Sequence, residues 1–276
     1  IQIMARHRGT YNPEREEPYE VSRYQIGKFM SCPACFWMDR VKGIKFPGMI
    51  PFLLNSATDT LLKKDFDKYR KMQRPHPLMI NQDLEHLVPF EHEEFEQWTK
   101  SLQLGLRYEF EELNLIIGGG LDDVWYNTQT EEIHIVDYKS TAGSMNSSKD
   151  GLKQISLEGH YKEGYKRQMD VYTWILRKKG FKASNKGYFV YVNGDQHFED
   201  GMLNQDGSRA NMGFEVQLIS YLVNTFWIEP TLKKLKECLD SKTCPEHAQT
   251  GFGYKGDQPC EYYRLFEGMR EHGLMN

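Results

Sequence analysis

The sequence lacks any apolar run long enough to cross a lipid bilayer, and its first residues lack the apolar core of a secretion signal. A membrane-spanning helix needs about 18 or more apolar residues in succession. A secretion signal needs a shorter apolar segment behind a basic start. We therefore expect a soluble cytoplasmic protein with no membrane partner.

An excess of positive charge is also missing. The 276 residues include 39 acidic and 35 basic ones, and the formal net charge is −4. Proteins that bind nucleic acid through bulk charge are strongly basic, so any such contact here needs local clusters. Two predicted helices carry basic clusters that could equally be solvated helix surface. They are Lys63, Lys64, Lys68, Arg70, Lys71 and Arg74 on the first, and Arg177, Lys178, Lys179, Lys182 and Lys186 near the second.

Cysteine is scarce, and the five cysteines are odd in number, which argues against a secreted disulfide framework. Cys32 and Cys35 have the spacing of half a metal knuckle. A zinc ribbon needs a second close pair, which the later cysteines do not form. These later residues are Cys238, Cys244 and Cys260. We expect plain buried or surface thiols.

The most informative segment runs from the triple glycine before LDDVW to IHIVDYKS. Between its two apolar stretches, residues 127–132 are polar and predict a hairpin turn centred on Gln129 and Thr130. This turn pairs Asp122 with Asp137 across neighbouring strands, with Cβ atoms about 5 Å apart. Two carboxylates so close repel each other unless a cation or a shared proton compensates.

Side chains of a strand alternate between its two faces, so Asp137 and Lys139 share one face while His134 and Tyr138 point to the other. Oxygen ligands of this kind suit Mg²⁺ or Mn²⁺. The alternative is a solvated hairpin that carries surface acids. Against that alternative, residues 115–117 and 133–136 are apolar and typical of a buried sheet.

The remaining pattern predicts several helices and one more buried strand. Ser22 is a suitable cap for a helix. This helix should end before Pro33, because helical geometry is disfavoured for a residue that precedes proline. The expected helices span residues 22–31, 55–72, 163–179 and 215–227, the last broken by Pro230 and resuming beyond it, and residues 187–192 form the further strand. We expect a polar arm at residues 1–19 and a single domain at residues 20–276.

Four segments, in this order, carry a resemblance: SCPACFW, GGLDDVW, IVDYKS and QMDVY, which together span residues 32–172. The last three match the patterns G-x-x-D, D-x-K after apolar residues, and Q-x-x-x-Y. The chain thus resembles the RecB-like branch of the PD-(D/E)XK nuclease superfamily, which includes lambda-exonuclease-like and CRISPR-associated nucleases. The resemblance implies an α/β fold: a central mixed sheet flanked by helices, with a restriction-endonuclease-like core and additional N- and C-terminal helices.

The resemblance also implies roles for individual residues. Asp122 and Asp137 would be metal-binding acids, with the backbone carbonyl of Tyr138 as a further ligand. Lys139 would orient the attacking water and offset charge at the phosphate.

Gln168 and Tyr172 would help to shape the site and to contact the nucleic acid strand. Taken without the other motifs, these two residues are more simply a polar pair within a helix packing face.

Two departures from the family bear on the cofactors. Many relatives have a histidine ligand on an early helix, and here Asp59 occupies that position, where it would bind a hard cation or merely complement the helix dipole. Iron–sulfur members use one early cysteine and three clustered late ones. Because Cys260 lacks a close partner, we do not expect an iron–sulfur cluster, and the alternative set of Cys32, Cys238, Cys244 and Cys260 is disfavoured.

The leading hypothesis is a Mg²⁺- or Mn²⁺-dependent deoxyribonuclease that hydrolyses DNA phosphodiester bonds. A second hypothesis, suggested by Asp59 and by the overall acidity, is a catalytically weak or inactive nucleic-acid-binding module on the same fold. A third is metal-dependent hydrolysis of a small phosphate ester.

Overall fold

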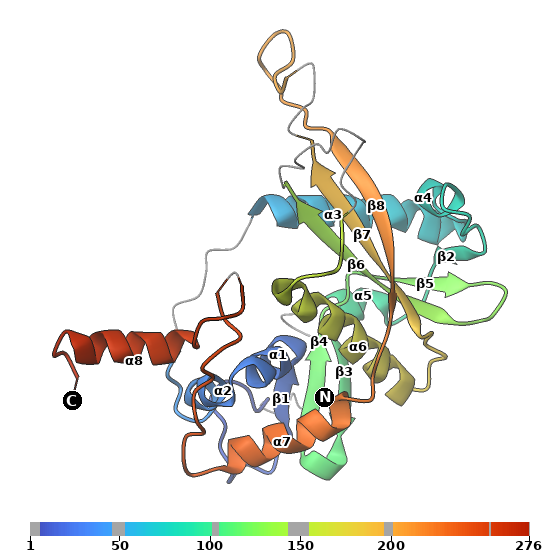
Figure 1. The fold of residues 1–276 in the computed structure, drawn as a ribbon. Helices are drawn as coiled ribbons and strands as arrows, with labels where there is room; N and C mark the ends of the chain where they lie inside the picture. The colour runs from blue at the N-terminus through green and yellow to red at the C-terminus, as the bar shows by residue number, and fades with distance from the viewer. Residues whose placement is uncertain are drawn as a thin grey trace.

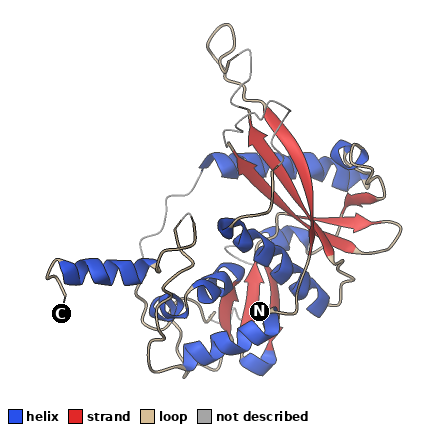
Figure 2. Ribbon diagram, viewed as in Figure 1, coloured by secondary structure: helices blue, strands red, loops and turns tan. Residues whose placement is uncertain are grey.

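The computed structural model describes residues 6–45, 53–100, 105–142, 155–195, 201–253 and 255–275. It has an α/β fold in which helices flank two mixed sheets (Figure 1, Figure 2). The predicted α/β class and flanking helices are confirmed. The strands, however, form two sheets rather than one central sheet, because residues 120–122 leave strand geometry between β4 and β5.

The strands differ in how they pair. In chain order they are β1 (Tyr19–Ser22), β2 (Leu87–Pro89), β3 (Leu106–Phe110), β4 (Leu115–Gly119), β5 (Asp123–Asn127), β6 (Ile133–Thr141), β7 (Lys186–Gly194) and β8 (Phe214–Leu222). The smaller sheet has the order β1-β4-β3 and the larger sheet β2-β5-β6-β7-β8. In the larger sheet only β6 and β7 run parallel. A parallel pair needs a crossover connection, and α6 provides it.

Some of the helices begin or end where local signals predict. The helices are α1 (Arg23–Ser31), α2 (Pro33–Arg40), α3 (Leu53–Met72), α4 (Pro77–Ile80), α5 (Phe95–Thr99), α6 (Glu163–Lys178), α7 (Ile228–Asp240) and α8 (Glu261–Glu271), with short 3₁₀ turns at Glu111–Leu113 (η1) and His160–Lys162 (η2). Ser22 and Gln25 form a reciprocal capping box at the start of α1. Helix α6 ends just before Gly180, whose φ of +91° favours glycine.

One predicted helix is wrong. Residues 214–222 form β8, which pairs with β7 along its whole length, instead of the helix expected over residues 215–227. Apolar residues at 216, 219 and 223 fit a helical period, and β8 is an edge strand whose burial alternates only weakly. Pro230 does not break a helix but lies in the first turn of α7, where its missing N–H is tolerated.

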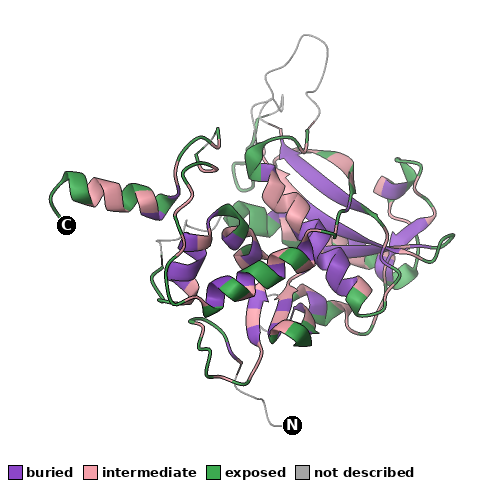
Figure 3. Ribbon diagram, turned by 60° about the horizontal axis from the view of Figure 1, so that its bottom comes forward, coloured by how far each residue is buried: buried purple, intermediate pink, exposed green. Residues whose placement is uncertain are grey.

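The larger sheet is covered on both faces. On one face, Phe66 of α3 packs with Trp125, Tyr138 and Tyr188 of the sheet. On the other face, α6 packs against the strand residues that alternate with these. They belong to a larger apolar cluster that includes Ile135 of β6. Long stretches of these strands are therefore buried (Figure 3).

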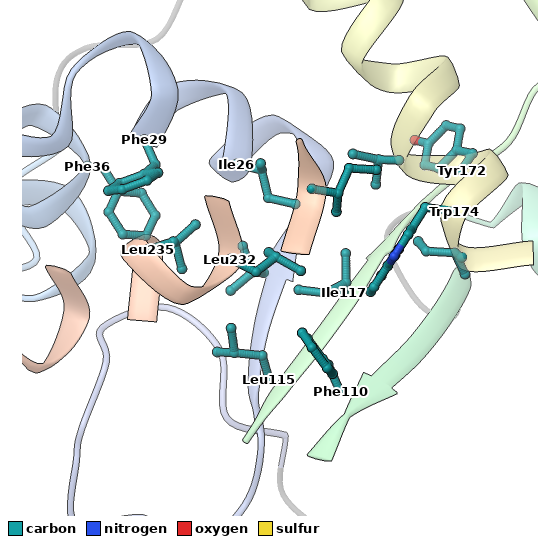
Figure 4. Close-up of a cluster of buried hydrophobic side chains, with 14 of the residues drawn as sticks. Ile26, Phe29, Phe36, Phe110, Leu115, Ile117, Tyr172, Trp174, Leu232 and Leu235 are labelled. Carbon is teal, nitrogen blue, oxygen red and sulfur yellow. The ribbon is translucent and has the colours of Figure 1, made fainter. Parts of the chain in front are cut away.

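The N-terminal and C-terminal parts of the chain share the larger core. Figure 4 shows Ile26 and Phe29 of α1 beside Leu232 and Leu235 of α7. Ile117, in the smaller sheet, lies in the same cluster. Segments separated by about 200 residues in sequence thus pack together. Among the described residues, no helix combines the length and apolarity that a membrane crossing needs.

Residues 6–18 belong to the expected arm, and they contact the core without forming a helix. His7 is buried, and its ring lies 5.7 Å from that of Tyr11 and 4.8 Å from that of Tyr19. Residues 1–5 lie outside the described part of the chain. The division into an arm and a single domain stays a prediction.

A buried ion pair joins α3 to the larger sheet. Asp123 is 1% exposed. Its Oδ1 accepts a hydrogen bond from Arg70 Nη2 at 2.5 Å, and its Oδ2 accepts one from the Tyr138 hydroxyl at 2.5 Å. Burial raises the pKa of Asp123, while the Arg70 guanidinium and the Tyr138 hydroxyl oppose the rise. Arg70, expected among a basic surface cluster, is instead internal.

We predict that Arg70→Met lowers the free energy of unfolding at pH 7.5 by about 3–5 kcal/mol, because Asp123 would remain buried without its cation. Urea unfolding followed by circular dichroism measures the loss. Lys71→Met, at the next and exposed position of α3, is the matched control and should change stability by less than about 0.5 kcal/mol. Equal effects of the two substitutions would contradict a structural role for this ion pair.

Candidate functional site

The hairpin register brings Asp122 and Asp137 together. Strand β5 pairs with β6 through Asp123 with Val136 and Val124 with Ile135, the predicted register. One residue further, the same register places Asp122 opposite Asp137. Asp122 Oδ2 accepts a hydrogen bond from the Tyr138 backbone N–H at 3.1 Å, so its side chain reaches across to β6.

Asp137 is the most deeply buried acid of the site, with 1% of its surface exposed. Its Oδ2 forms an ion pair with Lys139 Nζ. Its Oδ1 accepts a hydrogen bond from Gln168 Nε2 at 2.5 Å. Burial raises the pKa of Asp137 to about 7; the Lys139 ammonium opposes the rise and the charge of Asp122 adds to it. This carboxyl therefore changes charge near neutral pH.

The two faces of β6 are divided as predicted. Lys139 shares the face of Asp137, and its Nζ lies 4.7 Å from the centre of the Tyr165 ring. Tyr138 points to the opposite face, where it packs with Phe66. The backbone carbonyl of Tyr138 remains a predicted ligand.

Gln168 and Tyr172 face the site from α6, one helical turn apart. Gln168 binds Asp137, and Tyr172 is 3% exposed. Burial raises the pKa of Tyr172 to about 12, against the effect of Arg23 at the start of α1. A Cβ added at Gly119 would lie 2.5 Å from the Tyr172 hydroxyl, so a side chain at this position would displace the Tyr172 ring.

The acid predicted on the early helix lies beside the strand acids. Lys63 Nζ lies 2.8 Å from Asp59 Oδ2 and 3.4 Å from Asp122 Oδ1, so one ammonium bridges the two carboxylates. Burial raises the pKa of Asp59, and the charge of Asp122 adds to the rise. From the sequence, Lys63 was expected in a basic cluster that contacts nucleic acid or is solvated helix surface. Its spacing of four residues from Asp59 is the sequence signal that could have placed it here.

Two buried polar atoms near the acids have no hydrogen-bond partner among the described residues. They are Gln168 Oε1 and the hydroxyl of Tyr191. In the register of β6 and β7, the backbone of Tyr191 lies opposite that of Lys139. Buried polar groups are nearly always satisfied in folded proteins. These exceptions indicate groups that a ligand could satisfy.

A cavity of about 480 Å³ lies between α1, the start of α6 and the segment that follows α7. Tyr165, whose ring holds the Lys139 ammonium, is part of its wall. Its lining includes three cations, Arg23, Lys28 and Arg167, and two exposed aromatic rings, Tyr24 and Tyr161. Two acids, Glu163 and Glu261, also line it. By contrast, Arg177 of the second predicted basic cluster binds the Ala183 carbonyl and serves local structure.

No protein-family model matches the sequence, and the comparison with curated proteins finds no match. Among solved structures, the chain is similar to the crystal structure of a protein named "Putative exonuclease" from Eubacterium rectale. The two are 15% identical, with a TM-score of 0.37, over 80% of this chain and 83% of the other. A likeness of this size carries no argument about function, which must come from the site residues.

We predict that Asp137→Asn stabilises the protein when divalent ions are absent. The ordinary pKa of 3.8 rises to about 7 on folding, so the stability that the protonated carboxyl contributes is complete below about pH 4 and is lost as the pH rises to about 7. Asparagine carries no charge and avoids this loss. The free energy of unfolding of the variant should therefore exceed that of the wild type by up to about 4 kcal/mol above pH 7. Urea unfolding in EDTA between pH 4 and pH 8 measures the difference.

Asp83→Asn is the control for this comparison. Asp83 is exposed, and its φ of +54° is tolerated by asparagine. An Asp137→Asn protein that is less stable than the wild type across the whole pH range would show that the ionised carboxyl stabilises the fold.

Proposed function

We propose that this protein is a metal-dependent nuclease that hydrolyses DNA phosphodiester bonds. One observation carries the proposal: a buried carboxyl, Asp137, lies opposite Asp122 and on the same strand face as Lys139. Two carboxyls placed so close repel each other, and a bound divalent cation would compensate that repulsion. The motif order, which resembles that of RecB-like nucleases, supports the same chemistry.

The donor set fits Mg²⁺ or Mn²⁺. Both ions prefer carboxylate and carbonyl oxygens, and Asp122, Asp137, Asp59 and the Tyr138 carbonyl would hold one. When bound, such an ion polarises the scissile phosphate and lowers the pKa of the attacking water. The carboxyl of Asp137 must be ionised for this, and its Gln168 hydrogen bond fixes its orientation.

Lys139 has the second chemical role. The Tyr165 ring and Asp137 hold its ammonium at the site. An ammonium in a water-poor position stabilises the charge that develops on a phosphate during hydrolysis. It would also orient the attacking water, as the family motif implies.

The neighbouring cavity suits a DNA strand. Arg23 and Arg167 would contact phosphates, which supply most of the affinity for nucleic acid. Tyr24 and Tyr161 are 68% and 62% exposed, and exposed rings can stack on unpaired bases. The two arginines would thus supply local positive charge in a chain that has no overall excess of it.

A second candidate function is DNA binding without cleavage. It is favoured by the Lys63 ammonium, which already compensates Asp59 and Asp122 and competes with a metal ion for them.

Cleavage assays test the leading proposal. Purified protein with Mn²⁺ should degrade end-labelled DNA, single- or double-stranded, and Asp137→Asn should lower the rate by about a hundredfold or more. Asp83→Asn should cleave at the wild-type rate. Absence of cleavage by the wild type, or full cleavage by Asp137→Asn, would refute the proposal. Circular DNA in parallel reactions separates internal from terminal cutting.

Titration calorimetry with Mn²⁺ separates the two candidates. We expect Lys63→Met to tighten Mn²⁺ binding about fivefold, equivalent to about 1 kcal/mol, because it removes a competing cation. Lys64→Met, at the exposed neighbouring position, should leave the affinity unchanged. DNA binding with no detectable Mn²⁺ uptake by the wild type or by Lys63→Met would favour the binding module.

A further inference from the structure

Four metal-binding side chains meet at one point far from the acids in sequence. They are Cys32, Cys35, His247 and Cys260, whose ligand atoms all lie within 4.8 Å of one another. His247 Nδ1 is 3.1 Å from Cys260 Sγ and 4.0 Å from Cys35 Sγ. The three cysteines are at most 5% exposed. Three of the thiols, expected from the sequence to be plain buried or surface groups, thus lie together beside an imidazole.

The fold assembles this Cys₃His cluster from both ends of the chain. Cys32 caps the start of α2, and Cys35 lies in the first turn of that helix. His247 lies in the segment between α7 and α8, and Cys260 is the cap of α8. The spacing of the cysteines alone does not reveal this cluster, because its fourth member is a histidine.

The backbone around the cluster is arranged for thiolates. Cys32 Sγ accepts hydrogen bonds from the N–H groups of Cys35, at 3.4 Å, and Ala248, at 3.3 Å. The Ala248 carbonyl in turn accepts a hydrogen bond from the Cys260 N–H at 3.0 Å. Such outer contacts orient ligands and favour their charged form in metal sites.

The geometry points to a structural Zn²⁺ site, and we propose that Cys32, Cys35, His247 and Cys260 bind one Zn²⁺ ion. Zn–S bonds of about 2.3 Å in a tetrahedron place neighbouring ligand atoms about 3.8 Å apart, within the observed span. Three thiolates and an imidazole are the soft donors that Zn²⁺ accepts and Mg²⁺ does not. A multi-iron cluster would hold its ligands further apart and prefers four cysteines.

The two remaining cysteines lie outside the cluster. Cys244 is exposed, and Cys238 Sγ lies 3.8 Å from the Pro33 carbonyl. The grouping of Cys32 with Cys238, Cys244 and Cys260 is therefore not what the structure brings together.

Zinc would fix the C-terminal segment to the first two helices. Helix α8 projects away from the body of the protein (Figure 1). Gly251, Phe252 and Tyr262, which flank the late ligands, form one wall of the cavity whose other wall includes Arg23. A bound ion at this place would hold that wall against α1.

The test is metal analysis of protein purified without chelators. We expect about one Zn²⁺ per chain by mass spectrometry of the metal content, and loss of most of it in Cys35→Ser and Cys260→Ser. Cys244→Ser, which removes a nearby thiol, should keep its zinc. Asp137→Asn should also keep it, which separates this site from the proposed catalytic site.

Replacement of zinc by Co²⁺ gives a second readout on the wild type, should the serine variants fail to fold. Thiolate-to-cobalt charge transfer and the visible bands of tetrahedral cobalt are expected. Three results would overturn the proposal: a wild-type chain without zinc that binds Co²⁺ without thiolate bands, iron with acid-labile sulfide in place of zinc, or equal zinc loss from Cys244→Ser and Cys260→Ser.

Discussion

Electrostatic repulsion between Asp122 and Asp137 is the constraint on which the rest of the site depends. Water cannot screen Asp137, because the carboxyl lies inside the sheet. Three polar neighbours reduce the cost: Lys139 on the same strand, Gln168 from α6 and Lys63 from α3. Polar side chains from three elements, β6, α6 and α3, thus contact one pair of acids. Packing of apolar side chains alone would not require this convergence.

The adjacent residues Asp122 and Asp123 have different roles, because the side chains of a strand point alternately to its two faces. Asp123 points into the core beneath α3 and finds Arg70, which makes it a structural residue. Asp122 points to the other face and joins Asp137. Of these two neighbours in the sequence, Asp123 therefore stabilises the fold through its ion pair, whereas Asp122 destabilises it by repelling Asp137. The strand geometry, and not the residue type, decides which is which.

Local signals predicted much of this protein. The polar turn set the register of β5 and β6, Ser22 and Gln25 set the start of α1, and Gly180 set the end of α6.

Features that depend on contacts between distant parts of the chain could not be predicted from local sequence patterns. Edge strand β8 carries apolar residues that also fit a helical period, and only its pairing with β7 decides. The approach of His247 to Cys32 and Cys35 depends on chain closure over more than 200 residues, and no local pattern encodes it.

The turn at residues 127–132 carries a constraint that its exposed side chains do not reveal. Asn127 Oδ1 accepts the N–H groups of Gln129 and Thr130, so the loop has a defined length as well as a defined shape. Inserting or deleting one residue would rotate all of β5 to the wrong face of the sheet relative to β6. In either direction of slip, Asp122 would no longer lie opposite Asp137, and Asp123 would turn away from Arg70. Among descendants of this sequence, the loop can therefore drift in composition, while its length should be inherited unchanged.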